Sequence, residues 1–180
     1  MHPRSNRSKP AGLTLLRVAR RIGGPPHEGR LIAGSLVLSC ALGRSGVTRN
    51  KREGDGATPA GRWPLLYFYL RTPAPLRLPW RRTRPRDLWC DDPGSFLYNK
   101  PLHGPSHLGH EEMWRNDQLY DAVGVIGYNL HPRVRGRGSA IFFHIATDDH
   151  AATAGCVALR ARDMARLLPR LGRSVALLIG

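Results

Sequence analysis

Apolar residues gather in short runs separated by glycine and proline, which is the pattern of strands rather than of long helices. The runs 31–42 and 63–70 are rich in β-branched or aromatic residues and predict two strands. The runs 122–128 and 139–145 predict two more, and 174–179 predicts a strand at the end of the sequence. The pattern therefore favours a mainly β or α+β fold.

A single helix is predicted over residues 162–171, because apolar residues recur there at helical spacing. These residues are Met164, Leu167, Leu168 and Leu171. Gly172 follows at the position where a glycine commonly ends a helix. The predicted fold is thus mainly β with one C-terminal helix.

Two segments show no periodic pattern. Residues 71–119 are rich in proline and hold three of the four tryptophans, so we expect a long irregular insertion there. Residues 1–29 are basic, with glycine and proline near their end, and we expect an extended arm. The predicted organisation is a basic arm over 1–29 and one domain over 30–180, a length that supports one substantial core.

The net charge of the chain narrows the classes of molecule that it can bind. The chain has 28 Lys and Arg residues against 13 Asp and Glu, a net charge of +15. This excess suits nucleic acid or an anionic envelope, yet no zinc-finger, RNP-like or basic-helix pattern is present, so we expect no dedicated nucleic-acid partner. Residues 87–130 differ, with seven acidic and two basic residues. No run reaches the ~18–20 apolar residues of a membrane span, and we find no convincing signal peptide.

Three cysteines cannot all pair within the chain, so at least one thiol is free. Cys40 lies in an apolar run and is expected to be a buried core thiol, whereas carboxylates next to Cys90 should make it a poor nucleophile. A cluster of three histidines resembles a metal site, but the glycines and proline among them exclude a common helical face. These histidines are His103, His107 and His110. We therefore predict no metal and no cofactor.

Cys156 is the candidate nucleophile, since it follows Gly155 and stands twelve residues after His144. A thiol nucleophile needs a nearby base, and an imidazole can take its proton. We expect two antiparallel strands, joined by a loop over 147–154, to bring the two side chains together. Gly155 permits a close turn that aims main-chain N–H groups at an oxyanion. A cysteine that merely fills buried space is the alternative at this point.

Three segments carry a resemblance to a known family: 51–61 reads KREGDGATPAG, 136–144 reads GRGSAIFFH, and 153–159 reads TAGCVAL. In this order they resemble the L,D-transpeptidase catalytic domain of the YkuD family. Shorter segments that resemble its compact bacterial subgroup lie at 89–93, 112–115, 119–121 and 127–129.

The resemblance implies a β-sandwich and a cysteine that attacks the peptide bond after the meso-diaminopimelyl centre of a peptidoglycan stem. An amine or water then resolves the acyl-enzyme. Carried onto this sequence, Cys156 is the nucleophile, His144 is the base, and the N–H groups of Gly155 and Cys156 are the oxyanion donors. Two positions depart from the family, because Ala154 replaces a histidine and Ala158 replaces an arginine or asparagine. We expect these departures to affect the choice of acceptor amine and the rate of the reaction.

The resemblance also implies stem peptides as substrates, carbapenem-type inhibitors, and action in the cell envelope or periplasm. We expect a monomer. The acidic insertion is expected to recognise the free ammonium of diaminopimelate, as its local negative charge suggests. The residues predicted to bind substrate are Trp89, Asp91, Asp92, Tyr128, Asn129 and Thr153.

Several alternatives stay open at the level of the sequence. The same chemistry would serve an L,D-carboxypeptidase or amidase that hydrolyses stem peptides. A catalytically silent basic module that binds the wall or nucleic acid is a different class. Thr153 either bonds near the nucleophile or makes a turn. Lys51 and Asp55 are expected to stabilise their glycine-rich loop, and His150 to be a solvated loop residue.

Overall fold

The computed structural model describes residues 12–180. As predicted, this part of the chain is mainly β with one short helix near its C-terminus. Helix α1 spans Ala161–Leu167 and continues into a 3₁₀ turn, η1, over Leu168–Arg170. The strands are β1 (Leu13–Arg20), β2 (Glu28–Ala33), β3 (Leu36–Ala41), β4 (Val47–Thr48), β5 (Thr58–Pro59), β6 (Gly61–Leu70), β7 (Trp80–Arg82), β8 (Asp87–Cys90), β9 (Lys100–His103), β10 (His110–Glu112), β11 (Ala122–Ile126), β12 (Phe142–Ile145), β13 (Val157–Leu159) and β14 (Leu171–Ile179).

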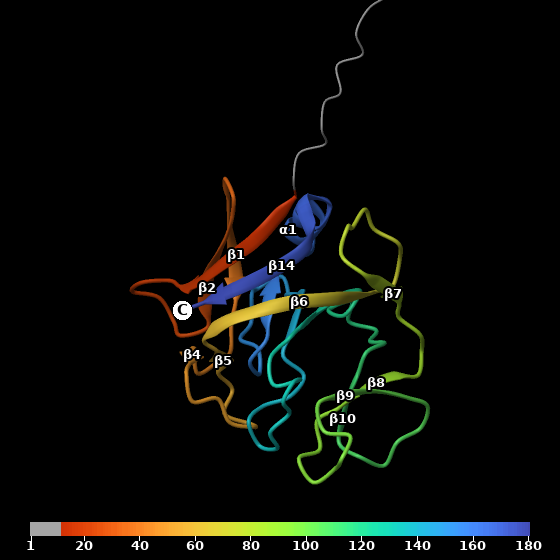
Figure 1. Ribbon diagram of the computed structural model, residues 1–180. Coiled ribbons are helices and arrows are strands. Elements are labelled where there is room, and N and C mark those ends of the chain that lie inside the picture. The colour runs from red at the N-terminus through yellow and green to blue at the C-terminus, as the bar shows by residue number, and fades with distance from the viewer. Residues whose placement is uncertain (1–11) are drawn as a thin grey trace, which may run out of the picture.

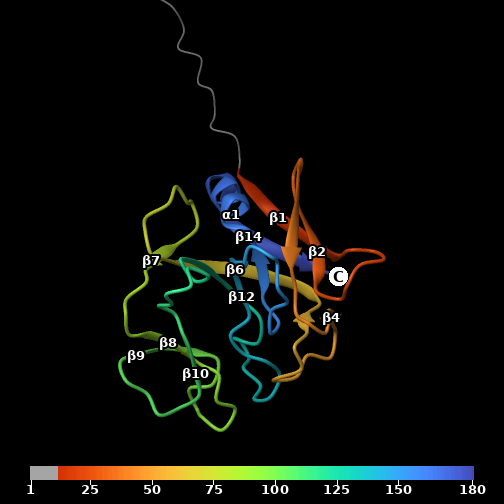
Figure 2. The ribbon, with the colours of Figure 1, turned by 180° about the vertical axis from the view of Figure 1, so that it is seen from behind.

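Eight strands form a closed, barrel-like mixed sheet, seen from the front in Figure 1 and from behind in Figure 2. Their order is β11-β12-β13-β3-β2-β1-β14-β6, and pairing between β6 and β11 closes the ring. The structure thus has one closed sheet where a β-sandwich was expected. The reason is the length of β6, because its first half pairs with β14 and its second half with β11. One strand thus joins both ends of the large sheet.

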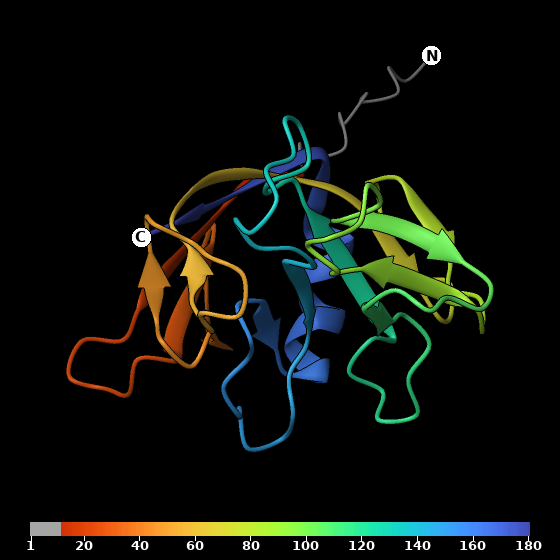
Figure 3. The ribbon, with the colours of Figure 1, turned by 90° about the horizontal axis from the view of Figure 1, so that it is seen from below.

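Alternate residues of the central strands enter two different apolar clusters, as the period of two of a β-strand requires. Phe143 and Val157 pack in the larger cluster, together with residues of α1 and β14. Phe142 and Cys156 pack in a second cluster with aromatic residues of the insertion, among them Trp89. The insertion forms a small antiparallel sheet, β10-β8-β9, which Figure 3 shows in green beside the central strands. The second cluster joins this small sheet to the barrel.

The N-terminal part of the fold differs from the prediction in two places. The apolar run 31–42 was predicted as one strand, but it belongs to a hairpin of β2 and β3, whose turn holds Gly34 at φ +60°. Glycine adopts this left-handed conformation without steric cost, so it permits the turn. The expected arm also contains β1, which pairs with β2 and β14. The part of the arm before residue 12 lies outside the described residues.

The insertion and the helix also end differently from the prediction. Four short strands, β7 to β10, occur within the segment expected to be irregular, although prolines and turns separate them. The α-helix ends before Pro169, which lacks an N–H group and crowds the preceding turn. The chain enters β14 at Leu171, so Gly172 lies in a strand and does not cap the helix.

A buried carboxylate holds the small sheet to the barrel. Asp87 is 2% exposed and accepts hydrogen bonds from the Arg81 guanidinium on both oxygens, at 2.8 Å each. The main-chain N–H of Arg84 donates to it at 2.8 Å, and His103 Nδ1 lies 3.1 Å away. This one side chain therefore links β7, β8 and β9.

We predict that Asp87→Ala lowers the free energy of unfolding by about 2–4 kcal/mol, because the Arg84 N–H and the Arg81 guanidinium lose a buried partner. Urea denaturation measures the change. Glu28→Ala is the matched control, since its ion pair with Arg21 is exposed and its loss should cost no more than about 1 kcal/mol. Equal losses in the two variants would contradict the assigned role of Asp87.

Candidate active site

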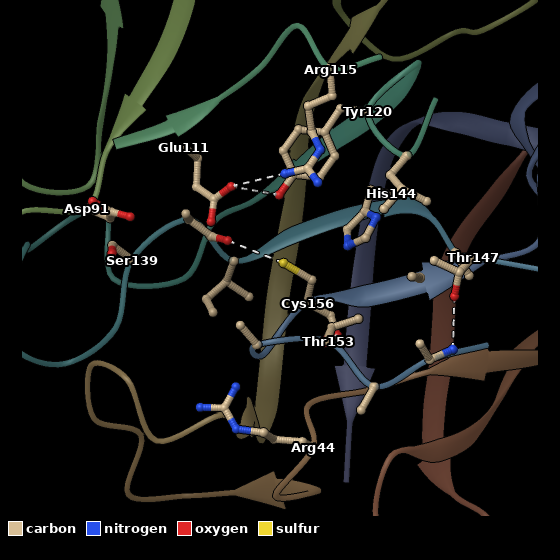
Figure 4. A pocket seen from close by; sticks show the side chains of 18 of the residues that line it. Arg44, Asp91, Glu111, Arg115, Tyr120, Ser139, His144, Thr147, Thr153 and Cys156 are labelled. Atoms are coloured by element: carbon tan, nitrogen blue, oxygen red, sulfur yellow. Dashed lines mark hydrogen bonds and ion pairs between the residues drawn. The ribbon is translucent and has the colours of Figure 1, made fainter. Parts of the chain in front are cut away.

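A pocket of about 320 Å³ opens between the small sheet and the adjacent ends of β12 and β13 (Figure 4). It is the place where the insertion, the glycine-rich loop after β4 and the catalytic candidates meet. Its lining includes Arg44, Lys51, Glu53, Asp91, Glu111, Arg115, Tyr120, Ser139, Ala140, His144, Thr147, Thr153 and Cys156.

Cys156 and His144 lie on the same side of the sheet because of how β12 and β13 pair. The strands are parallel, with His144 opposite Ala158. Side chains two residues apart share a face, so Cys156 and Ala158 point to the side of His144. The prediction of an antiparallel pair was wrong, although the same two side chains reach one pocket. Figure 4 shows both of them pointing into it.

The turn before Cys156 is fixed by Thr153. Its hydroxyl donates to the Cys156 carbonyl oxygen at 2.8 Å and accepts the Gly155 N–H at 3.1 Å. Gly155 has φ +143°, and a Cβ there would stand 2.8 Å from the Ala57 carbonyl oxygen, so only glycine fits. Because the Gly155 N–H already donates to Thr153, the N–H of Cys156 is the stronger candidate for an oxyanion donor.

The Cys156 thiol is buried and protonated at rest. The side chain is 7% exposed, its S–H donates to the Ala140 carbonyl oxygen, and its sulfur accepts the Phe142 N–H, each at 3.4 Å. Burial raises the pKa of the thiol to about 12; the Glu111 carboxylate also raises it, while the Phe142 N–H acts in the opposite direction. The resting form at neutral pH is therefore the thiol and not the thiolate.

One hydrogen bond fixes the orientation of the His144 ring. Its Nδ1 lies 2.8 Å from the Ile145 carbonyl oxygen, which can only accept, so Nδ1 carries the proton and Nε2 has a free lone pair. The Tyr120 ring packs edge-on at a centroid distance of 5.2 Å. Burial, with a smaller contribution from Arg115, lowers the pKa of the imidazole to about 4. In the described structure no hydrogen bond joins His144 to Cys156, as is common before substrate binds.

Residues 27–176 match the L,D-transpeptidase catalytic domain family, YkuD. The chain belongs to this family. A search of curated proteins finds no match to the chain. Membership confirms the resemblance seen in the motifs, and it implies peptidoglycan peptides as substrates and action at the cell wall. In the part of this YkuD protein that the structure describes, no helix has the length and apolar character needed to cross a membrane.

One wall of the YkuD pocket is acidic. Asp91 and Glu111 line it together with Glu53. Burial raises the pKa of Asp91, and the nearby Glu53 carboxylate raises it further. The pKa of Glu111 is raised by burial and then by Asp91, while Arg115, 3.9 Å away, partly offsets this. Asp92, also predicted to bind substrate, is not part of the wall, because its carboxylate turns back to the Gly94 N–H at 2.8 Å.

Three other predicted substrate residues support the pocket from outside its lining. Trp89 is buried beneath the site, packs edge-on against Phe142 and donates its indole N–H to Asn99. The Tyr128 hydroxyl donates to the Arg137 carbonyl oxygen at 2.6 Å. The Asn129 amide donates to two carbonyl oxygens of the same loop and accepts one N–H. These side chains shape the loop over 129–138.

The structure adds residues that the sequence pattern did not single out. Asn99 is buried, and its carbonyl oxygen accepts the N–H groups of Trp89 and Ala140, so it ties the insertion to the segment before β12. Glu53 accepts hydrogen bonds from the hydroxyls of Tyr98 and Ser139. The Glu-Gly-Asp-Gly motif marked Glu53, but an asparagine in a segment without periodicity carries no signal.

Lys51 and Asp55 stabilise their loop, as predicted. The buried Lys51 ammonium bonds to Asp55 at 2.6 Å and to the Arg52 carbonyl oxygen at 2.8 Å. Over residues 12–180 no group of three or more His, Cys, Asp or Glu side chains is placed to hold a metal ion. Two histidines of the sequence cluster that resembles a metal site have separate partners. His103 contacts Asp87, and His110 contacts the Leu108 carbonyl oxygen.

The lowered pKa of His144 predicts acid sensitivity. The folded protein keeps this imidazole neutral down to about pH 4, whereas the unfolded chain protonates it near 6.5. Stability is thus fully present above about pH 6.5 and falls as the pH drops toward 4. We expect wild type to lose about 2–3 kcal/mol more than His144→Gln between pH 7 and pH 4.5 in urea unfolding.

His107→Gln provides the control for this comparison, because His107 is exposed and should track the wild type. If His144→Gln loses as much stability on acidification as wild type does, the buried neutral imidazole is refuted.

Proposed function

We propose that the protein is a peptidoglycan L,D-transpeptidase in which Cys156 forms an acyl-enzyme with a stem peptide and transfers it to an amine. The observation that carries the proposal is the placement of a thiol and an imidazole from two paired strands in one pocket of a YkuD domain. The free lone pair on His144 Nε2 allows it to act as a base. The Cys156 N–H, next to the turn at Gly155, is the candidate oxyanion donor.

Acylation begins when the Cys156 S–H gives its proton to His144 Nε2 and the sulfur attacks the carbonyl carbon of the peptide bond after diaminopimelate. The tetrahedral oxyanion forms beside the Cys156 N–H, which stabilises its charge. The C–N bond then breaks, and the imidazolium gives the proton to the leaving amine. A thioester remains on Cys156, and His144 is again neutral.

In the second half, an acceptor amine attacks the thioester carbonyl. Its N–H proton passes to His144 Nε2, the C–S bond breaks, and the imidazolium returns the proton to the sulfur. The product is an amide cross-link between two stems. Water in place of the amine would give hydrolysis through the same steps, so the acceptor decides between transpeptidase and carboxypeptidase.

The pKa values of Cys156 and His144 before substrate binds support a transfer of the thiol proton that occurs together with the attack of the sulfur on the substrate. Burial raises the pKa of Cys156 to about 12 and lowers the pKa of His144 to about 4, so the neutral pair is favoured over an ion pair. Charge therefore develops only when a carbonyl carbon is present to receive the sulfur. This behaviour limits reaction of the thiol with reagents that do not fit the pocket.

The acidic wall supports recognition of a cation on the substrate. In the described structure, Asp91 forms no ion pair, and the charges that raise its pKa are neighbouring carboxylates. A substrate ammonium placed against Asp91 would stabilise its charged form. Diaminopimelate carries such an ammonium on its side chain. We therefore retain the hypothesis that the acidic insertion recognises this ammonium, and we assign the contact to Asp91 rather than Asp92.

The first prediction of this proposal concerns covalent acylation. A carbapenem incubated with the protein should add its mass once, because the thiolate opens the β-lactam ring and keeps the acyl group. Cys156→Ala should abolish the adduct. Cys40→Ala is the matched control, since Cys40 is also buried and its pKa is also raised to about 12. Intact-protein mass spectrometry decides; a folded wild type without adduct would support the silent binding module instead.

A second prediction separates transfer from hydrolysis. Purified tetrapeptide muropeptides incubated with the protein should yield dimers linked through two diaminopimelyl residues, and Cys156→Ala should yield none. Liquid chromatography with mass spectrometry of the products makes the measurement. Tripeptide monomers without dimers would assign the protein to the carboxypeptidases.

A third prediction tests the acidic wall. Asp91→Asn should raise KM for the stem peptide about fivefold to tenfold with little change in kcat, since one charge-assisted contact is lost. Asp92→Asn is the matched control, because its side chain lies outside the pocket, and its KM should stay within twofold of wild type. Equal effects, or none, would remove Asp91 from substrate recognition.

A further inference from the structure

A second pocket, of about 300 Å³, lies on the barrel beside the loop that joins β12 to β13. Its walls come from the β2–β3 hairpin, from Arg21 and His27 before it, and from Asp149, His150 and Arg160. The catalytic pocket uses Thr147 and residues 151–154 of the same loop, so one loop borders both pockets. None of the residues proposed for catalysis lines the second pocket.

The second pocket has an excess of positive charge. Arg21 is neutralised by Glu28, 2.7 Å away. Arg30 and Arg160 both line the pocket, and neither forms an ion pair within residues 12–180. The carboxylate Asp149 accepts hydrogen bonds from Thr147 and the Ala151 N–H. The lining therefore holds three arginines against two carboxylates, and two of the guanidinium groups form no ion pair with a carboxylate.

An imidazole in the same pocket lacks a partner. His150 Nε2 is inaccessible to solvent and has no hydrogen-bond partner in the described structure. A buried polar nitrogen without a partner costs free energy, but a ligand in the pocket cannot reach this one. Arg160 is close enough to His150 that its charge, after burial, lowers the pKa of the imidazole. His150 and Arg160, which both line the second pocket, are thus neighbours.

We propose that this second pocket binds a phosphate group, with Arg30 and Arg160 as charge partners. Guanidinium groups match tetrahedral oxyanions through paired N–H donors. Inorganic phosphate and phosphate monoesters present at least three terminal oxygens against the two of a carboxylate, which suits donors that approach from the hairpin on one side and the loop on the other.

The phosphate group has two possible sources, a free or polymer-borne phosphate and the headgroup of an anionic lipid. Both present charged non-bridging phosphate oxygens to the pocket, and the experiment distinguishes them. The proposal is independent of the transpeptidase activity, because it uses no residue of the catalytic pocket. Carbapenem acylation of the same variants therefore reports separately on the catalytic site and on folding.

The test titrates inorganic phosphate into the full chain at constant ionic strength, with ¹H–¹⁵N spectra as the readout. We expect saturable shifts at residues 147–151. The double variant Arg30→Ala/Arg160→Ala should weaken binding at least about tenfold, consistent with the loss of two charge-assisted contacts. The matched control is Arg62→Ala/Arg173→Ala, which removes two exposed arginines from β6 and β14 and should leave the affinity unchanged.

A second arm measures sedimentation with phosphatidylglycerol vesicles and with phosphatidylcholine vesicles. Binding to the former that is lost in Arg30→Ala/Arg160→Ala identifies the lipid headgroup as the source. Phosphate binding without vesicle binding identifies a soluble or polymer-borne phosphate. Acetate should shift the same signals at least about tenfold more weakly than phosphate. The proposal is overturned if phosphate gives no saturable shift, or if both double variants weaken binding equally while both still form the carbapenem adduct.

Discussion

The parallel pairing of β12 with β13 is the contact on which the catalytic pocket depends. It sets His144 opposite Ala158 and so brings His144 and Cys156 to one face. A slip of one residue would turn Cys156 into the larger apolar cluster and Val157 into the pocket. The register is held from the other side, because β13 also pairs with β3 and Thr153 bonds to both Leu42 and Arg44. The position of the thiol is therefore set by the closed sheet and not by its loop alone.

Packing of the insertion against the barrel explains the electrostatics of the pocket. The small sheet covers Phe142, Tyr120 and Cys156, so the thiol and the imidazole are both removed from water. The same loss of solvation raises the pKa of one and lowers the pKa of the other. Glu111 adds to the rise at Cys156. A neutral resting pair therefore follows from packing.

The sequence predicted what depends on local pattern. Strand β6, the C-terminal helix and the final strand follow from apolar periodicity, and the motifs marked Cys156 and His144. It missed what depends on pairing partners. Period-two alternation is the same in parallel and antiparallel strands, and the connection from residue 146 to 156 is shorter than most parallel crossovers, which favoured the wrong choice. The ring closure through β6 has no local signal at all, since it depends on where β14 and β11 fall along one long strand.

The count of charges along the chain indicated that residues 87–130 are acidic, but it did not show which carboxylates line the pocket. Three of the seven acidic residues in 87–130 form close ion pairs within the protein, Asp87 with Arg81, Asp117 with Arg115 and Asp121 with Arg71. What remains in the pocket is a small set of carboxylates that raise one another's pKa. Such a set is held at a cost in folding free energy, because like charges and burial both oppose ionisation. The closed barrel and the buried Asp87 hold these carboxylates in place, so the rest of the fold offsets this cost in folding free energy. A cation bound in the pocket would reduce the repulsion between the carboxylates.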